Sequence, residues 1–349
     1  MIRELGLDDN IQIYKEYYDN ARYKTIYHHP GFLVAEEKAE EYSTYLYILE
    51  EKKGFVILPA IKRKINDIEI FNGEKEEYFD LVTPHEYSGV IASDNNKSLI
   101  QTFYKEFTDF CRNNRIIFSF IRFNPYNSEH EVAENYCLIK SADQVFIDCN
   151  LEDITKEFSK SCKRNLKIAK KEGLSCEKVV SSLQNREIFL KLYADAMDRL
   201  NARSFFYFND GYFEKLFGLD FADIYFVYDS MKEKVLAATI ILKDYFNKVA
   251  YYHLSCRNAK RQGNGAMELL IESFSLELQK EGFRIVHLAG GPTESLRQFK
   301  ERFSEKRVKY YIGYNTTDEN TYMYLCQRYC NKYPEYQNSG FLPLYRSDE

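Results

Sequence analysis

The chain has 349 residues, of which 45% are hydrophobic and 29% charged, and its formal net charge is −5. The length is sufficient for two globular domains of ordinary size, and the composition excludes a disordered chain. A mildly acidic total excludes a general nucleic-acid binder and predicts no DNA partner, although a local basic patch could still hold a phosphorylated ligand.

The first half of the chain predicts a hairpin, then a loop, a helix and a strand. Apolar periodicity and turn residues indicate strands at 44–50, 55–61, 69–71 and 78–82, a helix at 97–112 and a strand at 116–123. A polar stretch, Asp80–Gly89, leads from the strands toward the helix. Its Asp80, Glu86 and Tyr87 either contact a ligand or form only a turn, and the sequence leaves both open.

Residues 160–171 carry six positive charges and no acid. At helical spacing, one face is cationic (Lys160, Lys163, Arg164, Lys167 and Lys171) and the opposite face is apolar (Phe158, Cys162, Leu166 and Ala169). Gly173 fits the position that ends such a helix. The pattern predicts a helix held to a core by one side, whose other side binds an anion or is simply solvated.

The second half repeats the order of the first. Strands are expected at 224–229, 235–242 and 248–256, followed by a loop at 260–265, a helix at 266–281, a strand at 283–289 and a final helix at 318–332. Hairpins rule out a purely parallel doubly wound sheet. We therefore expect an α/β (α+β) fold of two related domains, 1–150 and 151–349, with mixed, mostly antiparallel sheets flanked by helices.

The loop before the second-half helix has the composition of an anion site. It reads Lys260-Arg261-Gln-Gly263-Asn264-Gly265. Glycines let backbone amides approach a phosphate, and the start of the helix adds a favourable dipole. The loop lacks the Gly-Lys-Ser/Thr of a Walker loop, and a tight turn is the alternative interpretation. It resembles the acyl-CoA-binding segment of the GNAT superfamily of N-acetyltransferases, in which the position of Lys260 holds Arg or Gln.

Three further segments resemble the Fem-type (FemAB-like) acyltransferases of the same superfamily. Lys160–Gly173 is similar to their basic helix, with Arg164, Ala169 and Gly173 at matching positions. Gly290–Phe303 is similar to their Gly-Gly, Ser-Leu and Phe-Lys-x-x-Phe block. Phe79–Gly89 is similar to a first-domain stretch of relatives from envelope-polysaccharide loci, with His85 and Ser88 as departures.

The resemblance implies two tandem GNAT-like domains and transfer of an acyl group to an amine. It implies acyl-CoA, such as acetyl-CoA, as co-substrate, or aminoacyl-tRNA in the members that build peptidoglycan bridges. The donor would be held by Lys260, Arg261, Gly263, Asn264 and Gly265. The acceptor, a phosphorylated small-molecule or lipid-linked envelope precursor, would be held by Arg164, Lys163, Arg199 and Tyr87.

Acyl transfer requires a polarised carbonyl, a neutral amine and a proton for the leaving group. Lys300, in the Phe-Lys-x-x-Phe block, is the candidate cation near the thioester or ester carbonyl or near an acceptor phosphate, and the alternative is an ordinary lysine at the start of a helix. Tyr252 and His253 lie on the strand before the donor loop, with Tyr251 and His253 on one face and Tyr252 on the other. They are candidate proton carriers, although His253 could equally be a core histidine. Arg199 could instead form a surface ion pair with Asp195.

The cysteine pattern and the apolar runs predict the cellular compartment of the protein. None of the eight cysteines forms a Cys-x-x-Cys pair, which indicates reduced thiols, a cytoplasmic protein and no metal site. The N-terminus has no signal-peptide pattern, and no apolar run could span a bilayer, so membrane contact would be peripheral.

Three functions follow, in order of preference. The first is an acyl-CoA-dependent N-acyltransferase that acts on a nucleotide- or lipid-linked sugar or peptide precursor. The second is an aminoacyl-tRNA-dependent cross-bridge transferase with the same fold. The third is a non-catalytic relative that binds a phosphosugar.

Overall fold

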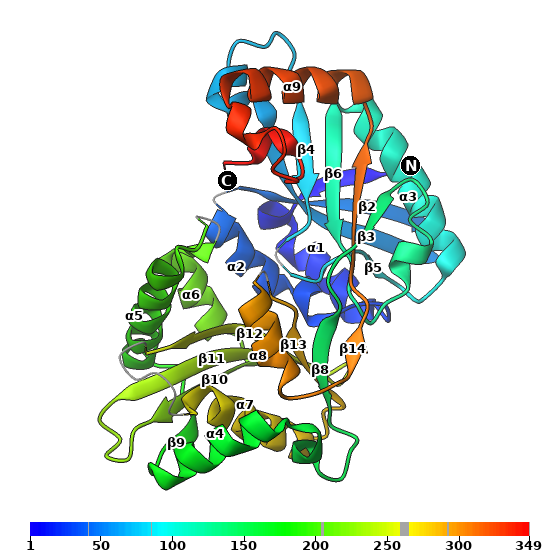
Figure 1. The fold of residues 1–349 in the computed structure, drawn as a ribbon. Coiled ribbons are helices and arrows are strands. Elements are labelled where there is room, and N and C mark those ends of the chain that lie inside the picture. The colour runs from blue at the N-terminus through cyan, green and yellow to red at the C-terminus, as the bar shows by residue number, and fades with distance from the viewer. Residues whose placement is uncertain (41, 85, 204–205, 259–264, 292, 349) are drawn as a thin grey trace. The chain divides into compact units, whose positions relative to one another are not determined.

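The computed structural model describes residues 1–40, 42–84, 86–203, 206–258, 265–291 and 293–348, except the side chains of residues 38–40 (Figure 1). The chain forms two compact units, Met1–Ser141 with Tyr310–Glu349, and Ala142–Lys309. The expected division at residue 150 assigned the C-terminal segment to the second half, but a strand of that segment completes the sheet of the first unit. Pairing between strands so distant in sequence leaves no local pattern to recognise.

The first unit is built on an eight-stranded sheet with the order β1-β2-β3-β4-β6-β15-β7, in which β5 pairs with β3. Among the described strand pairs of this sheet, β4 and β6 are parallel and the others are antiparallel. The strands are β1 (Arg3–Gly6), β2 (Thr44–Glu51), β3 (Gly54–Lys64), β4 (Phe79–Val82), β5 (Ile91–Ala92), β6 (Ile116–Arg122), β7 (Cys137–Lys140) and β15 (Tyr311–Thr316).

Helices cover both faces of this sheet because adjacent strand residues point to opposite sides. The helices are α1 (Leu7–Asn20), α2 (Pro30–Glu40), α3 (Lys97–Asn113) and α9 (Glu319–Lys332). Leu46 and Ile48 of β2 pack with α1 and α2, whereas Tyr47 and Leu49 pack with α3. α9 packs against β6 through Leu325 and Tyr329.

The second unit is built on a seven-stranded sheet with the order β14-β8-β13-β12-β11-β10-β9. In the described part of this unit, β12 and β13 are parallel and the other strand pairs are antiparallel. The strands are β8 (Gln144–Asp148), β9 (Ser175–Val179), β10 (Ala222–Tyr228), β11 (Val235–Asp244), β12 (Val249–Arg257), β13 (Ile285–Ala289) and β14 (Arg307–Val308). The helices are α4 (Lys160–Lys171), α5 (Leu183–Leu200), α6 (Asp210–Phe217), α7 (Ala266–Lys280) and α8 (Glu294–Glu301).

The helices of the second unit form two layers around its sheet (Figure 1). α4 and α7 share a buried core with β8 and β10–β13, to which α7 contributes Leu270, Phe274 and Leu278. α5 packs on β11 and β12 from the other face and joins α6 through rings of Phe189 and Phe213, 5.9 Å apart. The mixed, mostly antiparallel sheets flanked by helices confirm the predicted fold class.

α4 has the predicted two-sided character. Cys162, Leu166 and Ala169 are buried, and the cations of the helix are exposed. The hydroxyl of Ser159 caps the start by accepting from the amide of Cys162 at 3.2 Å. Gly173 has φ +71°, and the amide of Leu174 donates to the carbonyl of Ala169, which is a Schellman ending.

The helices expected at 97–112, 266–281 and 318–332 agree with α3, α7 and α9 within two residues at each end. The strand expected at 69–71 is wrong, because Glu69–Phe71 is a 3₁₀ turn. The side chain of Asn66 accepts from the amide of Tyr78 and donates to the carbonyl of Glu76, which closes this segment as a loop. None of the described helices is long and apolar enough to cross a membrane.

Candidate active site

The central feature of the second unit is the point where β12 and β13 part. Their parallel ladder consists of three pairs, from Val249 opposite Ile285 to Tyr251 opposite His287. β12 continues to Arg257, but the described residues beyond Tyr251 form no further ladder pair with β13. A ligand that lies between the strands beyond this point would meet backbone groups that the ladder no longer joins.

Irregularities on both strands explain why they part at this level. Along β11, Ile240 pairs with Leu254 and Ile241 with Tyr252, so His253 is an extra residue on β12. β13 also shifts its register against β8 after His287. A bulge bends a strand and increases its local twist, and here both strands shift register close to the level where their ladder ends.

His253 lies at this bulge and faces α6. Its Nε2 is 2.7 Å from the hydroxyl of Tyr212, and the two groups form a hydrogen bond. The Tyr212 ring is buried and stacks on Phe208 at a centroid distance of 4.3 Å, which fixes its position. A phenol hydrogen-bonded to an imidazole can relay a proton, since each group can donate and accept. His253 was predicted from the sequence as a candidate proton carrier, whereas Tyr212 was not.

Tyr252 points to the other face, as predicted. Its ring stacks on Phe274 of α7 at 5.7 Å, and its side chain is 8% exposed. Burial raises the pKa of the Tyr252 hydroxyl well above its usual value, and a hydrogen bond with Ser255 lowers it by less. The hydroxyl therefore keeps its proton at neutral pH and can act as a donor.

Lys300 approaches Tyr252 from α8. Its ammonium is 5.9 Å from the centroid of the Tyr252 ring, and the residue is only 7% exposed. The two aromatic residues of the Phe-Lys-x-x-Phe block anchor the helix, because Phe303 is buried against Phe158 and Phe299 packs on Phe303. The structure thus brings Lys300 and Tyr252 together, with His253 next along the strand. A buried cation in such a place can stabilise negative charge that develops on a carbonyl oxygen.

Most of the expected donor loop, Lys260, Arg261, Gly263 and Asn264, lies outside the described residues. Gly265 is described and precedes α7 with φ +74°, and a Cβ placed on it would lie 2.2 Å from the carbonyl oxygen of Asn165. Close packing of α4 on the start of α7 therefore requires a glycine at 265 whether or not a ligand binds. The Asn165 amide also donates to Glu268 of α7 at 2.7 Å.

The expected acceptor residues of the second unit do not come together. Arg164 and Lys163 are exposed on α4, and because Asn165 contacts Gly265, they lie near the start of α7. Arg199 is exposed near the end of α5, on the opposite face of the sheet, where its charge acts on the Cys256 thiol of β12. Among the described residues Arg199 has no ion-pair partner, so the pair with Asp195 does not form.

In the first unit, Tyr87 is a core residue. It is 3% exposed, and its ring meets those of Tyr27 and Tyr310 edge-on at 5.6 and 5.3 Å. Asp80 is fully buried and bonded to the guanidinium groups of Arg63 at 2.6 Å and Arg346 at 2.7 Å. Asp80 therefore holds the C-terminal segment in place, and its carboxylate is saturated by these two ion pairs.

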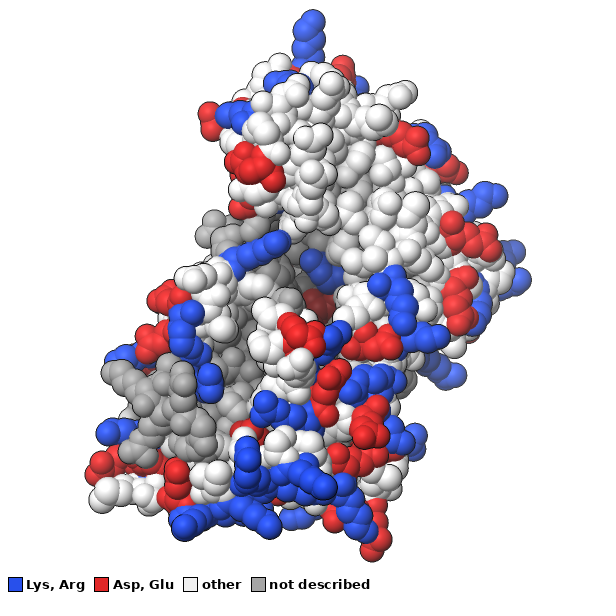
Figure 2. Space-filling model, viewed as in Figure 1, with Lys and Arg blue, Asp and Glu red and all other residues white. Residues whose placement is uncertain are grey.

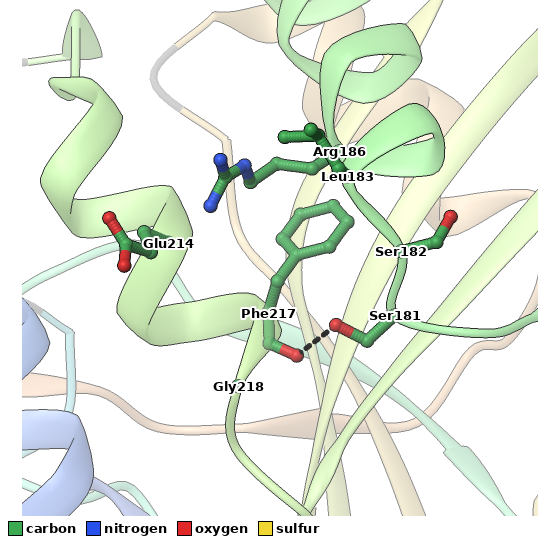
Figure 3. A pocket seen from close by; sticks show the side chains of 7 residues that line it. All are labelled: Ser181, Ser182, Leu183, Arg186, Glu214, Phe217 and Gly218. Carbon is green, nitrogen blue, oxygen red and sulfur yellow. Dashed lines mark hydrogen bonds between the residues drawn. The ribbon is translucent and has the colours of Figure 1, made fainter.

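A small surface pocket of about 190 Å³ lies between the start of α5 and the end of α6. Figure 3 shows Arg186 extending over the ring of Phe217 toward Glu214, beside Ser181 and Ser182. None of the residues that line it was identified from the sequence. Among the described residues there is also no cluster of three or more side chains suited to a metal ion.

Comparison with known proteins identifies the fold. No family model and no curated protein matches the sequence. Among solved structures, FemX matches with a TM-score of 0.65 at 9% identity, over 92% of this chain and 99% of that one. The C-terminal domain of a putative lysylphosphatidylglycerol synthetase from Agrobacterium fabrum matches with 0.61 at 12% identity, over 89% and 94%. L-PGS from Bacillus licheniformis matches with 0.60 at 11% identity, over the same shares.

These matches extend over both units and confirm the predicted fold. The chain has a Fem-type fold of two tandem GNAT-like domains. At 9 to 12% identity the likeness concerns the fold alone.

Proposed function

We propose that the protein is an N-acyltransferase that moves an acyl group, such as acetyl, from acyl-CoA to an amine. The observation that carries this proposal is the parting of β12 and β13 beside the Tyr212–His253 pair. An extended thioester arm fits between two such strands, because it can complete the backbone hydrogen bonds that the strands no longer make to each other.

In this proposal each step of the reaction is assigned to a described side chain. The amine nitrogen attacks the thioester carbonyl carbon, the carbon–sulfur bond breaks, and coenzyme A leaves as a thiolate. His253, supported by Tyr212, accepts the proton of the amine. Lys300 stabilises the negative charge on the carbonyl oxygen, the Tyr252 hydroxyl donates a hydrogen bond to the departing sulfur, and the thiolate then takes the proton that His253 accepted.

The proposed acceptor is an amine on a nucleotide- or lipid-linked envelope precursor. Two observations support it: the resemblance of the sequence to envelope-related Fem-type proteins, and the fold shared with FemX and with a protein named as a lysylphosphatidylglycerol synthetase. Arg199, exposed on the face of the sheet that carries the Tyr212–His253 pair, is the candidate for the acceptor phosphates. Arg164 and Lys163, beside the start of α7, suit the phosphates of the donor better.

Calorimetric titration with coenzyme A and acetyl-CoA tests the proposal. We expect micromolar binding of both, followed by acyl transfer to an amino-sugar nucleotide that His253→Gln reduces at least ~100-fold, in the range of general-base catalysis. Arg186→Gln, at the separate pocket near α6, is the control and should leave both binding and turnover unchanged. Absence of coenzyme A binding would contradict the proposed donor.

Aminoacyl-tRNA is the second candidate donor, and the exposed cations of α4 are the observation that favours it. Five of the six have no acid within ion-pair distance among the described residues: Lys160, Lys163, Arg164, Lys167 and Lys171. Activity with a charged tRNA should then fall steeply as salt rises, because each phosphate contact releases counterions. Turnover that does not change with salt would exclude this donor, and turnover with any amine would exclude a purely binding role.

A further inference from the structure

The exposed side of α4 carries more charge than one donor nucleotide requires. Its six cations are all exposed: Lys160, Lys163, Arg164, Lys167, Lys170 and Lys171. Lys170 is paired with Glu272 at 2.9 Å, and the Lys163 ammonium donates to the Lys156 carbonyl at 3.0 Å. The other four have no acid within ion-pair distance among the described residues. In Figure 2 Lys and Arg side chains gather along the lower edge of the view, where α4 lies in Figure 1.

An exposed apolar residue lies next to this cationic face. A Cβ built on Gly173, just after α4, would be 3.1 Å from the Cβ of Ser230, so the turn between β10 and β11 lies against the end of the helix. The next residue of that turn is Met231, which is 74% exposed. A row of cations with an apolar residue at one end has both features that bind a protein to a lipid surface.

We propose that the α4 face and Met231 dock on a bilayer surface rich in anionic phospholipids. Twelve residues at 1.5 Å each give a cationic row of about 18 Å, long enough to meet several headgroups at once. Five of its six cations are lysines, whose compact ammonium groups suit a fluid layer of headgroups more than the fixed phosphate geometry that arginine recognises.

The chemistry of the face favours a bilayer over RNA. α4 contains no aromatic residue, whereas sites for single-stranded or looped RNA commonly stack bases on aromatic rings. The apolar Met231 side chain cannot bind an RNA phosphate, but it can enter the acyl boundary of a bilayer. The inference does not depend on the proposed acyl transfer, although a docked protein would meet a lipid-linked acceptor in two dimensions.

Sedimentation with vesicles tests this docking. We expect the protein to bind vesicles of phosphatidylcholine and phosphatidylglycerol in equal parts, and not to bind phosphatidylcholine alone. The triple variant Lys160→Gln, Lys167→Gln and Lys171→Gln should bind about 100-fold more weakly, since each cation near an anionic surface contributes about fivefold. All three side chains are exposed, so the variant should fold normally.

A matched control removes the same charge elsewhere. Lys52, Lys53 and Lys75 are exposed and belong to the first unit, and their replacement by Gln should leave vesicle binding unchanged. Met231→Ser should weaken binding about tenfold, and this loss should persist at high salt because it is apolar.

Three outcomes would overturn the proposal. One is equal binding to neutral and anionic vesicles, and another is equal loss in the α4 triple and its control. The third is tight binding of bulk tRNA, abolished in the α4 triple, together with no binding to vesicles. That result would make the face an RNA surface.

Discussion

The buried carboxyl of Glu129 predicts how the stability of the first unit changes with pH. Its carboxyl is buried, accepts from the amide of Val90 at 3.0 and 3.1 Å, and is hydrogen-bonded by the hydroxyl of Tyr104. Gly89 precedes Val90 with φ +76°, and a Cβ there would lie 2.3 Å from the carboxyl. Burial raises the pKa of Glu129 from 4.5 to about 8, and the two hydrogen bonds offset only part of this rise.

A raised carboxyl pKa makes the folded state bind a proton that the unfolded state has already released. Its contribution to stability is complete below pH 4.5 and is lost as the pH rises through 8. At 1.36 kcal/mol per pH unit, the interval from 4.5 to 8 corresponds to about 5 kcal/mol. The amide of Glu129→Gln resembles the protonated carboxyl and cannot ionise, so the stability of this variant lacks the fall with pH that Glu129 causes.

Urea unfolding of both proteins between pH 5 and pH 8, followed by circular dichroism, measures the effect. From pH 6 to pH 8 the difference in unfolding free energy should move by about 2 kcal/mol in favour of Gln. His28 contacts the same loop, and burial lowers its pKa to about 4, but it titrates in both proteins and cancels. Parallel stability curves for the two proteins would refute the reasoning.

Four more substitutions, one of them a control, test particular contacts. Gly265→Ala should lower the free energy of unfolding by about 3 kcal/mol, because the residue has a positive φ and its new Cβ would overlap the α4 backbone. Gly282→Ala is the control: it has φ +84° but nothing within 4 Å, so it should cost about 1 kcal/mol in the same denaturant titration. Asp80→Asn should lower the free energy of unfolding by about 3–5 kcal/mol, because it removes the charge that two buried guanidinium groups share. Limited proteolysis should then cut the C-terminal segment around Arg346 faster. An unchanged rate would count against Asp80 as the residue that holds this segment. Tyr212→Phe should lower kcat roughly tenfold with the donor KM unchanged, as steady-state kinetics would report; an unaltered kcat would remove Tyr212 from the proton relay.

The sequence predicted those features that depend on residues close together in the chain. The two faces of α4, its glycine ending and the alternation of Tyr252 and His253 all follow from helical or strand periodicity, which neighbouring residues determine. The Phe-Lys-x-x-Phe block is a further local case, since its two aromatic residues anchor the same helix that carries Lys300.

Contacts between distant segments were not predictable in this way. Tyr212 and His253 are 41 residues apart, and Asp80 and Arg346 are 266 apart. The parting of β12 and β13 depends on bulges, which arise from the pairing of several strands and not from one segment. The requirement for Gly265 likewise comes from the approach of α4, so a phosphate-binding motif and a packing constraint looked the same in the sequence.

The position of β15 has a consequence for how the chain folds during synthesis. In the sheet of the first unit, β15 separates β6 from β7, and β7 has no other strand partner among the described residues. The ribosome delivers β15 only after the whole of Ala142–Lys309 has been made. The unit Ala142–Lys309 can thus fold as soon as it emerges, whereas the sheet of Met1–Ser141 has an unpaired edge at β6 until β15 is made. The unit that contains the N-terminus should be the last to finish folding.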